Sequence, residues 1–294
     1  MDGVFVVDKP DGMTSHDVVE AVRARLKGRK VGHAGTLDPE ATGVLLVLVG
    51  KATKLSRFLL ELEKEYVFSV QLGLETDTLD RWGKVLARND AGQVTLDDIL
   101  AAASRFRGRY QQVAPSISAI KHRGVPLYKM ARRGESAPMK TRLVWIRDFK
   151  VLDYYPPLVT IRVVCSSGTY VRSLARDMGR QIGCGAAVFC LRRVRVGSFG
   201  EREAARLESI VSADDPVRHM LSISESLRHM PRISIKPESV AGIRAGRSPV
   251  SEDIAEVGPG TLSEYTALAD SSGDIIGIAR RRDHSGEYRI ERIL

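Results

Sequence analysis

Hydrophobic and polar positions along the chain switch between strand-like and helix-like spacing. Short apolar runs rich in β-branched residues predict strands at residues 3–7, 44–49, 66–72, 158–165 and 188–196. Apolar positions three and four residues apart predict helices at residues 18–26, 51–62, 96–106 and 169–182. This order favours an α+β fold, in which a mixed, mainly antiparallel sheet forms a platform with flanking helices.

The pattern changes after Pro231. Strand-like stretches at residues 233–235, 265–268, 275–280 and 288–293 are separated by Gly, Ser and Asp turns. They predict a small all-β domain at 231–294, which follows a larger domain at 1–230. A chain of 294 residues has room for two domains of this unequal size.

Residues of about 115–145 interrupt the larger domain. This segment is basic, contains Gly124, Pro126, Gly134 and Pro138, and has only a short helical pattern at 127–133. Glycine and proline at this density break regular elements. The segment is therefore expected to be an insertion that lies over a surface.

Positive charge is concentrated in two parts of the chain. The formal net charge is +9, and residues 105–150 alone hold 12 Lys or Arg against 2 Asp or Glu. Residues 162–195 hold 7 basic residues against 1 acidic residue. Both parts also contain tyrosines. Clustered positive charge attracts polyanions, so a nucleic-acid partner is expected.

Several function classes find no support in the sequence. The longest apolar run, residues 44–49, is far below the roughly 20 residues of a membrane span, and no secretory signal is visible, so a cytoplasmic protein without a membrane role is expected. The three cysteines form no C-x-x-C pair, which argues against a disulfide framework and a zinc site. No phosphate loop or H-E-x-x-H pattern is present, and residues 183–188 end in Val where a dinucleotide fingerprint needs Gly or Ala, so no cofactor is expected.

The most informative stretch is Gly-rich and runs from residue 32 to residue 43. Its only Asp is Asp38, which is followed by Pro39 and flanked by glycines on both sides. An Asp-Pro pair in such a loop is usually an ordinary turn. A loop held between rigid apolar elements is also a place where catalytic groups concentrate, and a carboxylate can act as a nucleophile.

The loop sequence GHAGTLDPEATG resembles the catalytic loop of the bacterial tRNA pseudouridine-55 synthases, the TruB family. Further motifs of that family follow in the same order, at residues 3–14, 64–66 with 72–78, 115–133, 168–177 and 191–193. The segment from Pro231 resembles a PUA-type RNA-binding domain more weakly, through residues 235–246 and the last strands. The resemblance therefore implies the pseudouridine synthase fold with a small PUA-like domain.

The activity implied by this resemblance is the isomerisation of uridine to pseudouridine at position 55 in the T-loop of tRNA, with the base flipped out of its stack. Asp38 would be the catalytic nucleophile, and the sequence leaves open whether it attacks the uracil ring or the ribose. Arg172 would pair with Asp38, because an ionised carboxylate beside a base needs a cation. The resemblance assigns the remaining substrate contacts to His33, Tyr66, Tyr170 and Leu191.

The partner implied by the family is the T-arm of tRNA, bound by a monomer without an obligate protein partner. The residues expected to contact the RNA backbone are basic and lie in the insertion: Lys121, Arg123, Lys129, Arg132 and Arg133. Two alternatives remain. One is a guide-RNA-dependent synthase of a ribonucleoprotein, and the other is a non-catalytic tRNA-binding protein on the same fold, which need not keep both Asp38 and Arg172.

Overall fold

The structure is a computed structural model that describes residues 1–115, 121–122, 125–126, 141–258, 264–282 and 287–294. Its contacts divide the chain into two compact units. The first unit comprises Met1–Pro39, Val44–Leu60 and Gly197–Leu294, and the second comprises Glu40–Gly43 and Glu61–Val196. The predicted boundary near Pro231 is a different division, based on sequence texture, and it stays a prediction.

The N-terminal part of the first unit packs a helix on a small sheet. Its elements are β1 (Gly3–Lys9), α1 (Ser15–Arg25), β2 (Val31–Ala34), β3 (Thr42–Val49), η1 (Gly50–Leu55) and α2 (Ser56–Leu60). Thr14 begins α1 with a capping box, in which its side chain accepts from the Asp17 amide and Asp17 accepts from the Thr14 amide. β2 pairs with β3 in antiparallel fashion.

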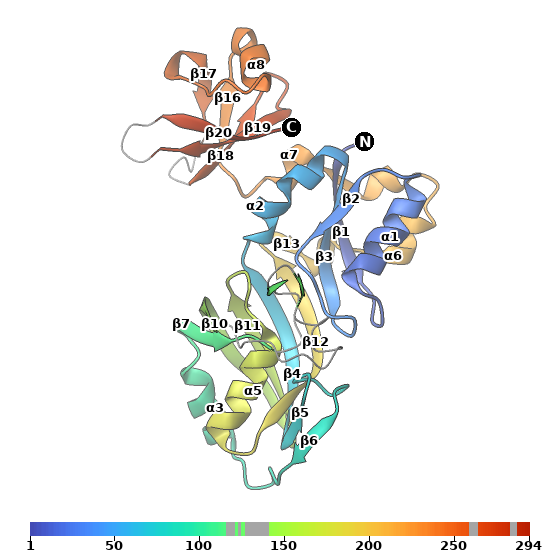
Figure 1. Cartoon of the computed structure of the whole chain (residues 1–294), viewed down its shortest axis with the longest axis vertical. Coiled ribbons are helices and arrows are strands. Elements are labelled where there is room, and N and C mark those ends of the chain that lie inside the picture. Colours follow the sequence, from blue (N-terminus) through green and yellow to red (C-terminus); the bar gives the residue numbers. More distant parts are fainter. Residues whose placement is uncertain (116–120, 123–124, 127–140, 259–263, 283–286) are drawn as a thin grey trace. The chain divides into compact units, whose positions relative to one another are not determined.

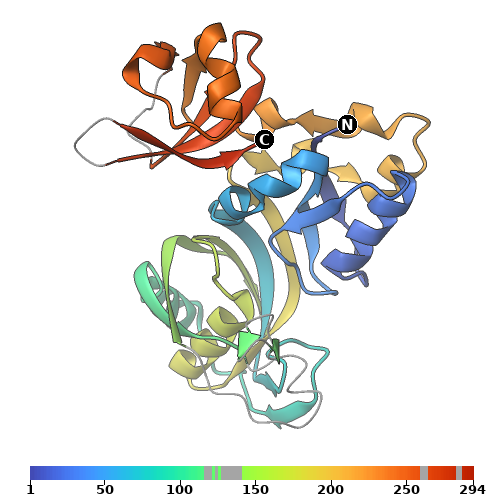
Figure 2. The same ribbon diagram turned by 45° about the horizontal axis from the view of Figure 1, so that its top comes forward.

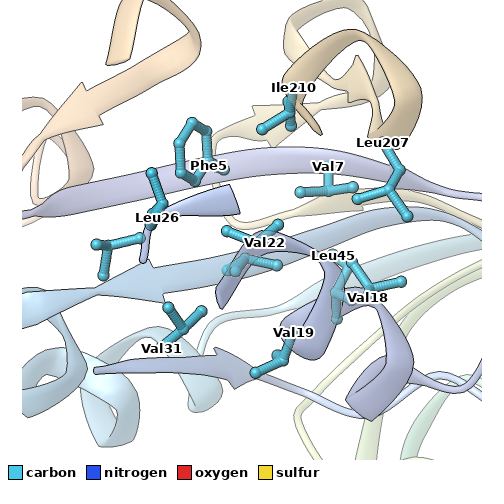
Figure 3. Close-up of a cluster of buried hydrophobic side chains, with 12 residues drawn as sticks. Phe5, Val7, Val18, Val19, Val22, Leu26, Val31, Leu45, Leu207 and Ile210 are labelled. Atoms are coloured by element: carbon cyan, nitrogen blue, oxygen red, sulfur yellow. The ribbon is translucent and has the colours of Figure 1, made fainter. Parts of the chain in front are cut away.

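Segments from the C-terminal half complete this core. They are β13 (Phe199–Gly200), η2 (Glu201–Glu203), β14 (Ala205–Arg206), α6 (Leu207–Val211), η3 (Pro216–His219), β15 (Met220–Ser222) and α7 (Ile223–Ser226). β14 pairs with β1 in parallel and β15 pairs with β1 in antiparallel fashion. The apolar face of α1 contacts Phe5 and Leu45, and Ile210 of α6 closes the same buried cluster (Figure 3).

The end of the chain forms a separate five-stranded sheet. Its elements are β16 (Arg232–Ile235), α8 (Pro237–Arg244), η4 (Ser251–Asp253), β17 (Ile254–Val257), β18 (Tyr265–Ala269), β19 (Ile275–Arg281) and β20 (Tyr288–Ile293), in the order β17-β16-β18-β19-β20. Ile233, Ile243 and Leu268 belong to a core of its own. Helix α8 lies against this sheet, as Figure 2 shows, and the all-β expectation did not include it.

The second unit is built on an antiparallel sheet in the order β12-β4-β11-β10-β7. The strands are β4 (Lys64–Leu72), β7 (Gly108–Val113), β10 (Thr141–Tyr155), β11 (Leu158–Cys165) and β12 (Ala186–Val196). Helices α3 (Leu96–Ser104) and α5 (Val171–Ile182) cover one face of this sheet (Figure 1). A hairpin of β5 (Leu74–Thr76) and β6 (Val85–Arg88) and a short pair of β8 (Lys121–His122) and β9 (Val125–Pro126) complete the described part.

The predicted fold class is confirmed as α+β with a mainly antiparallel sheet and a C-terminal β region. Two local expectations were wrong. Residues 51–62 form a 3-10 turn followed by a five-residue helix instead of one helix, and the stretch expected as a loop at 32–43 contains β2 and the start of β3. The short helix expected at 127–133 lies outside the described residues.

Candidate active site

Asp38 lies in the short loop between β2 and β3, and the backbone on both sides of it is held in place. Ser15, at the start of α1, donates its hydroxyl to the Leu37 carbonyl at 3.1 Å and accepts from the Leu37 amide at 2.8 Å. The Gly12 amide donates to the Pro39 carbonyl at 3.1 Å. Asp38 itself is half-buried. The carboxylate therefore projects from a fixed piece of chain.

Lys9 is the second support of this loop. Its side chain is fully buried, and its ammonium donates to the carbonyls of Pro10, Met13 and Pro39 at 2.5–2.8 Å. A buried cation is tolerated only with such partners, because its desolvation costs several kcal/mol. Lys9 and Ser15 were not singled out from the sequence. Lys9 does lie in the motif at residues 3–14, where the signal was its charge between buried strand residues and a turn.

His33 lies in β2, directly opposite Val47 of β3, and is half-buried. It belongs to the first unit, together with Asp38. The other four residues assigned to the substrate belong to the second unit. The expected pairing of Asp38 with Arg172 would join the two units, and it stays a prediction.

In the second unit, Tyr66 and Leu191 lie on neighbouring strands. Tyr66 of β4 is 8% exposed and stands directly opposite Arg193 of β12, while Leu191 stands opposite Phe68. Residues directly opposite in an antiparallel pair lie on the same face of the sheet, and alternate residues of a strand share a face. Tyr66, Phe68, Leu191 and Arg193 therefore line one face of the β4–β12 pair.

Tyr170 is fixed through its backbone at the start of α5. Its amide donates to the side-chain oxygen of Gln112 at 2.8 Å, and the side-chain amide of Gln112 donates back to the Tyr170 carbonyl at 3.0 Å. Gln112 is almost fully buried in β7. This pair sets the first turn of α5, the helix that carries Arg172.

Arg172 is 7% exposed and is anchored to the loop that follows β5. Its Nη1 donates to the Thr78 carbonyl at 2.9 Å and lies 3.7 Å from Oδ2 of Asp80. Asp80 in turn accepts from the Thr78 hydroxyl at 2.6 Å and from the Trp82 amide at 3.2 Å. The guanidinium is thus held by a carboxylate whose own position is fixed by hydrogen bonds.

Sequence reasoning missed Asp80. The motif at 72–78 ends two residues before it, and an acid after a Thr-Asp-Thr run was the signal available. What makes Asp80 important is its contact with a residue 92 positions further along the chain, which no local pattern reveals.

Two further cations are buried beside Tyr66. Lys64 lies on the same face of β4 and is 4% exposed, and Arg193 of β12 is 1% exposed. The Lys64 ammonium donates to the Leu62 carbonyl at 2.5 Å. Burial, together with the neighbouring charge of Arg193, lowers the pKa of Lys64 to about 8.

The residues expected to contact the RNA backbone are not placed by this structure. Arg123, Lys129, Arg132 and Arg133 lie outside the described residues. Lys121 belongs to the two-residue strand β8, and its side chain is outside the description as well. Their assignment stays a prediction.

Within the described ranges, no group of three or more His, Cys, Asp or Glu side chains is arranged to hold a metal ion. Over the same part of the chain, no helix is long and apolar enough to cross a membrane.

Comparison with known proteins gives a consistent result along the chain. Residues 23–171 match the model of the TruB family pseudouridylate synthase N-terminal domain, and residues 172–230 match the tRNA pseudouridylate synthase B C-terminal domain. The chain belongs to the TruB family of pseudouridine synthases. It is therefore an isomerase of this class, and the enzyme predicted from the sequence is confirmed. The first match includes Asp38 and Tyr66, and the second includes Arg172 and Leu191.

Similar proteins cover nearly the whole chain. The tRNA pseudouridine synthase B of Syntrophotalea carbinolica is 39% identical over 100% of this chain and 98% of its own length. Those of Pasteurella multocida and Geobacter sulfurreducens are 35% and 41% identical over 97% and 89% of this chain, and over 93% and 86% of their own lengths.

Solved structures of related complexes share the fold. One is an H/ACA RNP bound to a substrate RNA containing 2'-deoxyuridine, with a TM-score of 0.78 and 26% identity, and the other is a Cbf5-Nop10-Gar1 complex, with a TM-score of 0.79 and 26% identity. Each comparison covers 99% of this chain and 84% of the matched chain.

Proposed function

We propose that this TruB-family enzyme converts uridine to pseudouridine at position 55 in the T-loop of tRNA and acts as a monomer without a guide RNA. The TruB relatives named as tRNA enzymes are 35–41% identical to it, whereas the proteins of the matched ribonucleoprotein complexes are 26% identical. This difference favours the stand-alone enzyme over the guide-RNA-dependent alternative. A cytoplasmic location stays a prediction.

The observation that carries the proposal is a carboxylate on a fixed loop. Ser15, Gly12 and Lys9 hold the residues immediately before and after Asp38. A nucleophile must be presented in a defined geometry, because small displacements are costly to the rate. A tRNA-binding protein without activity would have no need for this arrangement.

In the proposed reaction Asp38 is the nucleophile, and its first target is either the uracil ring or C1' of the ribose. The N1–C1' bond breaks, the C5–C1' bond forms, the proton on C5 leaves, and N1 gains a proton. No electrons are exchanged with an outside group, so the isomerisation is balanced without a redox cofactor. The base must first leave its stack, which costs a few kcal/mol.

The other residues would receive the flipped nucleotide. Tyr66 would stack on the uracil, and Tyr170 and Leu191 would line the pocket. Arg172, held by Asp80 and the Thr78 carbonyl, would present its charge to the reacting carboxylate. His33 would fill the space that the base leaves in the RNA.

The test is an assay on one unmodified tRNA transcript without guide RNA, in which pseudouridine is mapped to a single position. The wild-type protein should modify the T-loop uridine. Asp38→Asn should abolish the product, because an amide cannot serve as the nucleophile, while tRNA binding stays within a few-fold of wild type. Product formation by Asp38→Asn within tenfold of wild type would contradict the assignment, and a wild-type requirement for guide RNA would support the alternative.

A further inference from the structure

The end of the β5–β6 hairpin carries a stack of three side chains that the proposed reaction does not use. The Arg81 guanidinium lies over the Trp82 ring and over the Phe189 ring, 4.4 Å from each centroid. We propose that this Trp82–Arg81–Phe189 stack binds an unpaired nucleotide of the RNA substrate. The inference rests on the proposed function and adds a binding site to it.

The stack is rigidly attached to the sheet. The Arg81 amide donates to the Val188 carbonyl at 2.8 Å, and the Val188 amide donates to the Leu79 carbonyl at 3.0 Å. Phe189 follows Val188 on β12. The hairpin loop and the sheet strand therefore hold the three side chains in register, and little conformational freedom remains to be lost on binding.

The surface around the stack has the chemistry of a nucleotide platform. Trp82 is 44% exposed, and Val85 and Leu86, which begin β6 of the same hairpin, are 43% and 65% exposed. Stacking on an aromatic ring suits any base, because every base has a π-face. A base stacked on the Trp82 ring would remove this exposed indole from solvent.

Positive charge lies on the second half of the hairpin, whereas its first half holds Glu75, Asp77 and Asp80, of which Asp80 pairs with Arg172. Residues 81–88 hold Arg81, Lys84 and Arg88 and no acidic residue. Among the described residues, none of these three cations takes part in a recorded ion pair. Cations beside an exposed aromatic ring match a phosphate beside a base.

The stack also lies next to the candidate site in the same unit. The Trp82 amide donates to the Asp80 carboxylate, the same group that holds Arg172. Phe189 lies at the register shift of β12 between Val188 and Cys190, directly before the segment that carries Leu191. The nucleotide bound here is therefore an unpaired neighbour of the flipped uridine.

The chain has only two tryptophans, Trp82 and Trp145, so Trp145→Phe leaves Trp82 as the sole indole reporter. Titration of this variant with unmodified tRNA transcript should quench the Trp82 emission, with a midpoint that matches the Kd from a separate binding assay. In the otherwise wild-type protein, Trp82→Ala should weaken tRNA binding by roughly 5- to 100-fold. Trp82→Phe should restore most of the affinity, because a ring remains available for stacking.

Arg81→Gln should lower the log–log dependence of affinity on salt by about 0.7 units, the expected loss for one single-strand phosphate contact. Tyr155→Ala is the matched control, because it removes an aromatic side chain of the same unit that is 77% exposed and that, within the described ranges, has no cation stacked on it. It should bind tRNA like wild type. Urea unfolding of each variant shows whether the protein stays folded.

Unchanged Trp82 emission at saturating tRNA, or a Trp82→Ala affinity within twofold of wild type, would overturn the proposal. So would an equal loss of affinity in Tyr155→Ala. Fluorescence and binding do not require turnover, so they test this site on bound tRNA whether or not the enzyme modifies that tRNA. Failure of the wild-type protein to form pseudouridine in tRNA would instead contradict the proposed function.

Discussion

At the scale of single residues, the candidate site is organised by buried cations. Lys9 is satisfied by three carbonyls, and Arg172 is held by one carbonyl and the Asp80 carboxylate. Removing one partner of such a group leaves the other buried without compensation, which is strongly destabilising. The precision of the site therefore depends on residues that need not touch the substrate.

The sequence alone pointed to Asp38, Tyr66 and Arg172, because each lies in a motif that resembles the family. It did not point to Lys9 or Asp80. Their roles arise from contacts between distant segments, residues 9 with 39 and residues 80 with 172. Composition and local spacing carry no information on such contacts.

Arg172→Lys keeps the positive charge, yet it is expected to slow the reaction considerably. A lysine lacks the planar guanidinium and reaches the Thr78 carbonyl and Asp80 less well. Loss of one charged hydrogen bond is worth about 1.5–3 kcal/mol, so the single-turnover rate at saturating tRNA should fall roughly 10- to 100-fold. The tRNA Kd should stay close to wild type, and Asp80→Asn should show the same pattern to a smaller degree.

A different result would assign Arg172 another role. If Arg172→Lys keeps the wild-type rate at saturating tRNA and loses only affinity, Arg172 contacts phosphate and does not act beside Asp38.

Lys64→Met tests the burial of the second cation. Burial lowers the pKa of Lys64 to about 8 in the folded protein, below the ordinary 10.5. Between these values the unfolded chain binds more protons than the folded one, so this group makes stability rise with pH. The free energy of unfolding of wild type relative to Lys64→Met should therefore increase by about 2 kcal/mol from pH 7 to pH 9.5.

Urea unfolding of both proteins at the two pH values measures this difference. The other titrating groups are the same in both proteins, so their contributions cancel. Lys150→Met, which removes an exposed lysine of β10, is the control and should track wild type at both pH values. If the difference in the free energy of unfolding between wild type and Lys64→Met does not change with pH, Lys64 stays protonated in the folded protein.

At the scale of elements, β10 shows why a strand can be missed from the sequence. β10 is the longest strand in the part of the chain that the structure describes, yet its apolar positions are interrupted by charged residues. In the fold one of these charges, Asp148, belongs to a network of ion pairs that spans neighbouring strands. Glu65 of β4 bonds Arg162 of β11 and Arg195 of β12, and Arg162 also approaches Asp148 of β10 at 3.3 Å.

This chain of ion pairs lowers the pKa of Glu65. Burial alone would raise its pKa, but hydrogen bonds from Arg162 and Arg195 bring the pKa below its ordinary value. A pattern of hydrophobicity along one strand cannot show that charges on four strands compensate one another. The helices α3 and α5, whose apolar spacing is a local property, were correctly predicted.

Ser15→Ala tests whether the start of α1 holds the catalytic loop. The substitution leaves the Leu37 amide and carbonyl without their buried partner, at a cost of about 1–3 kcal/mol. Alanine is a good helix former, and Thr14 provides the cap, so α1 itself should remain. The rate at saturating tRNA should fall about tenfold or more, whereas His16→Ala, an exposed change one residue further, should leave it unchanged.

The measurement is a single-turnover rate with each variant at saturating tRNA, together with helix content by circular dichroism. A wild-type rate for Ser15→Ala would mean that Lys9 and Gly12 suffice to position Asp38.

At the scale of the whole molecule, the clusters of positive charge lie outside the C-terminal sheet. The basic clusters lie at residues 105–150 and 162–195, whereas the 64 residues from Pro231 hold 9 basic and 10 acidic residues. The C-terminal sheet therefore cannot supply the main electrostatic attraction to RNA. Its contribution to binding must come from shape and from individual contacts.

Deletion of Pro231–Leu294 is expected to leave a folded enzyme with weaker tRNA binding. The β16–β20 sheet has its own core around Ile233 and Leu268, apart from the cluster that packs α1 on β1 and β3. Its recorded contacts with the preceding part of the unit include the ion pair Arg57–Glu291 at 2.6 Å and the ring contact of Phe58 with Tyr265. Neither Phe58 nor Tyr265 belongs to the cluster that packs α1 on β1 and β3, so cutting these contacts should not open that core.

Thermal unfolding, pseudouridine formation at saturating tRNA and the tRNA Kd separate the possible outcomes. The truncated protein should unfold cooperatively and keep most of its rate at saturation, with the loss confined to affinity. Loss of the Tyr265 ring exposes Phe58, which is 5% exposed in the full chain, so a Phe58→Ser variant of the truncated protein guards against aggregation at this patch. A truncated protein that remains unfolded even with this change would show that the sheet and the catalytic core fold as one body.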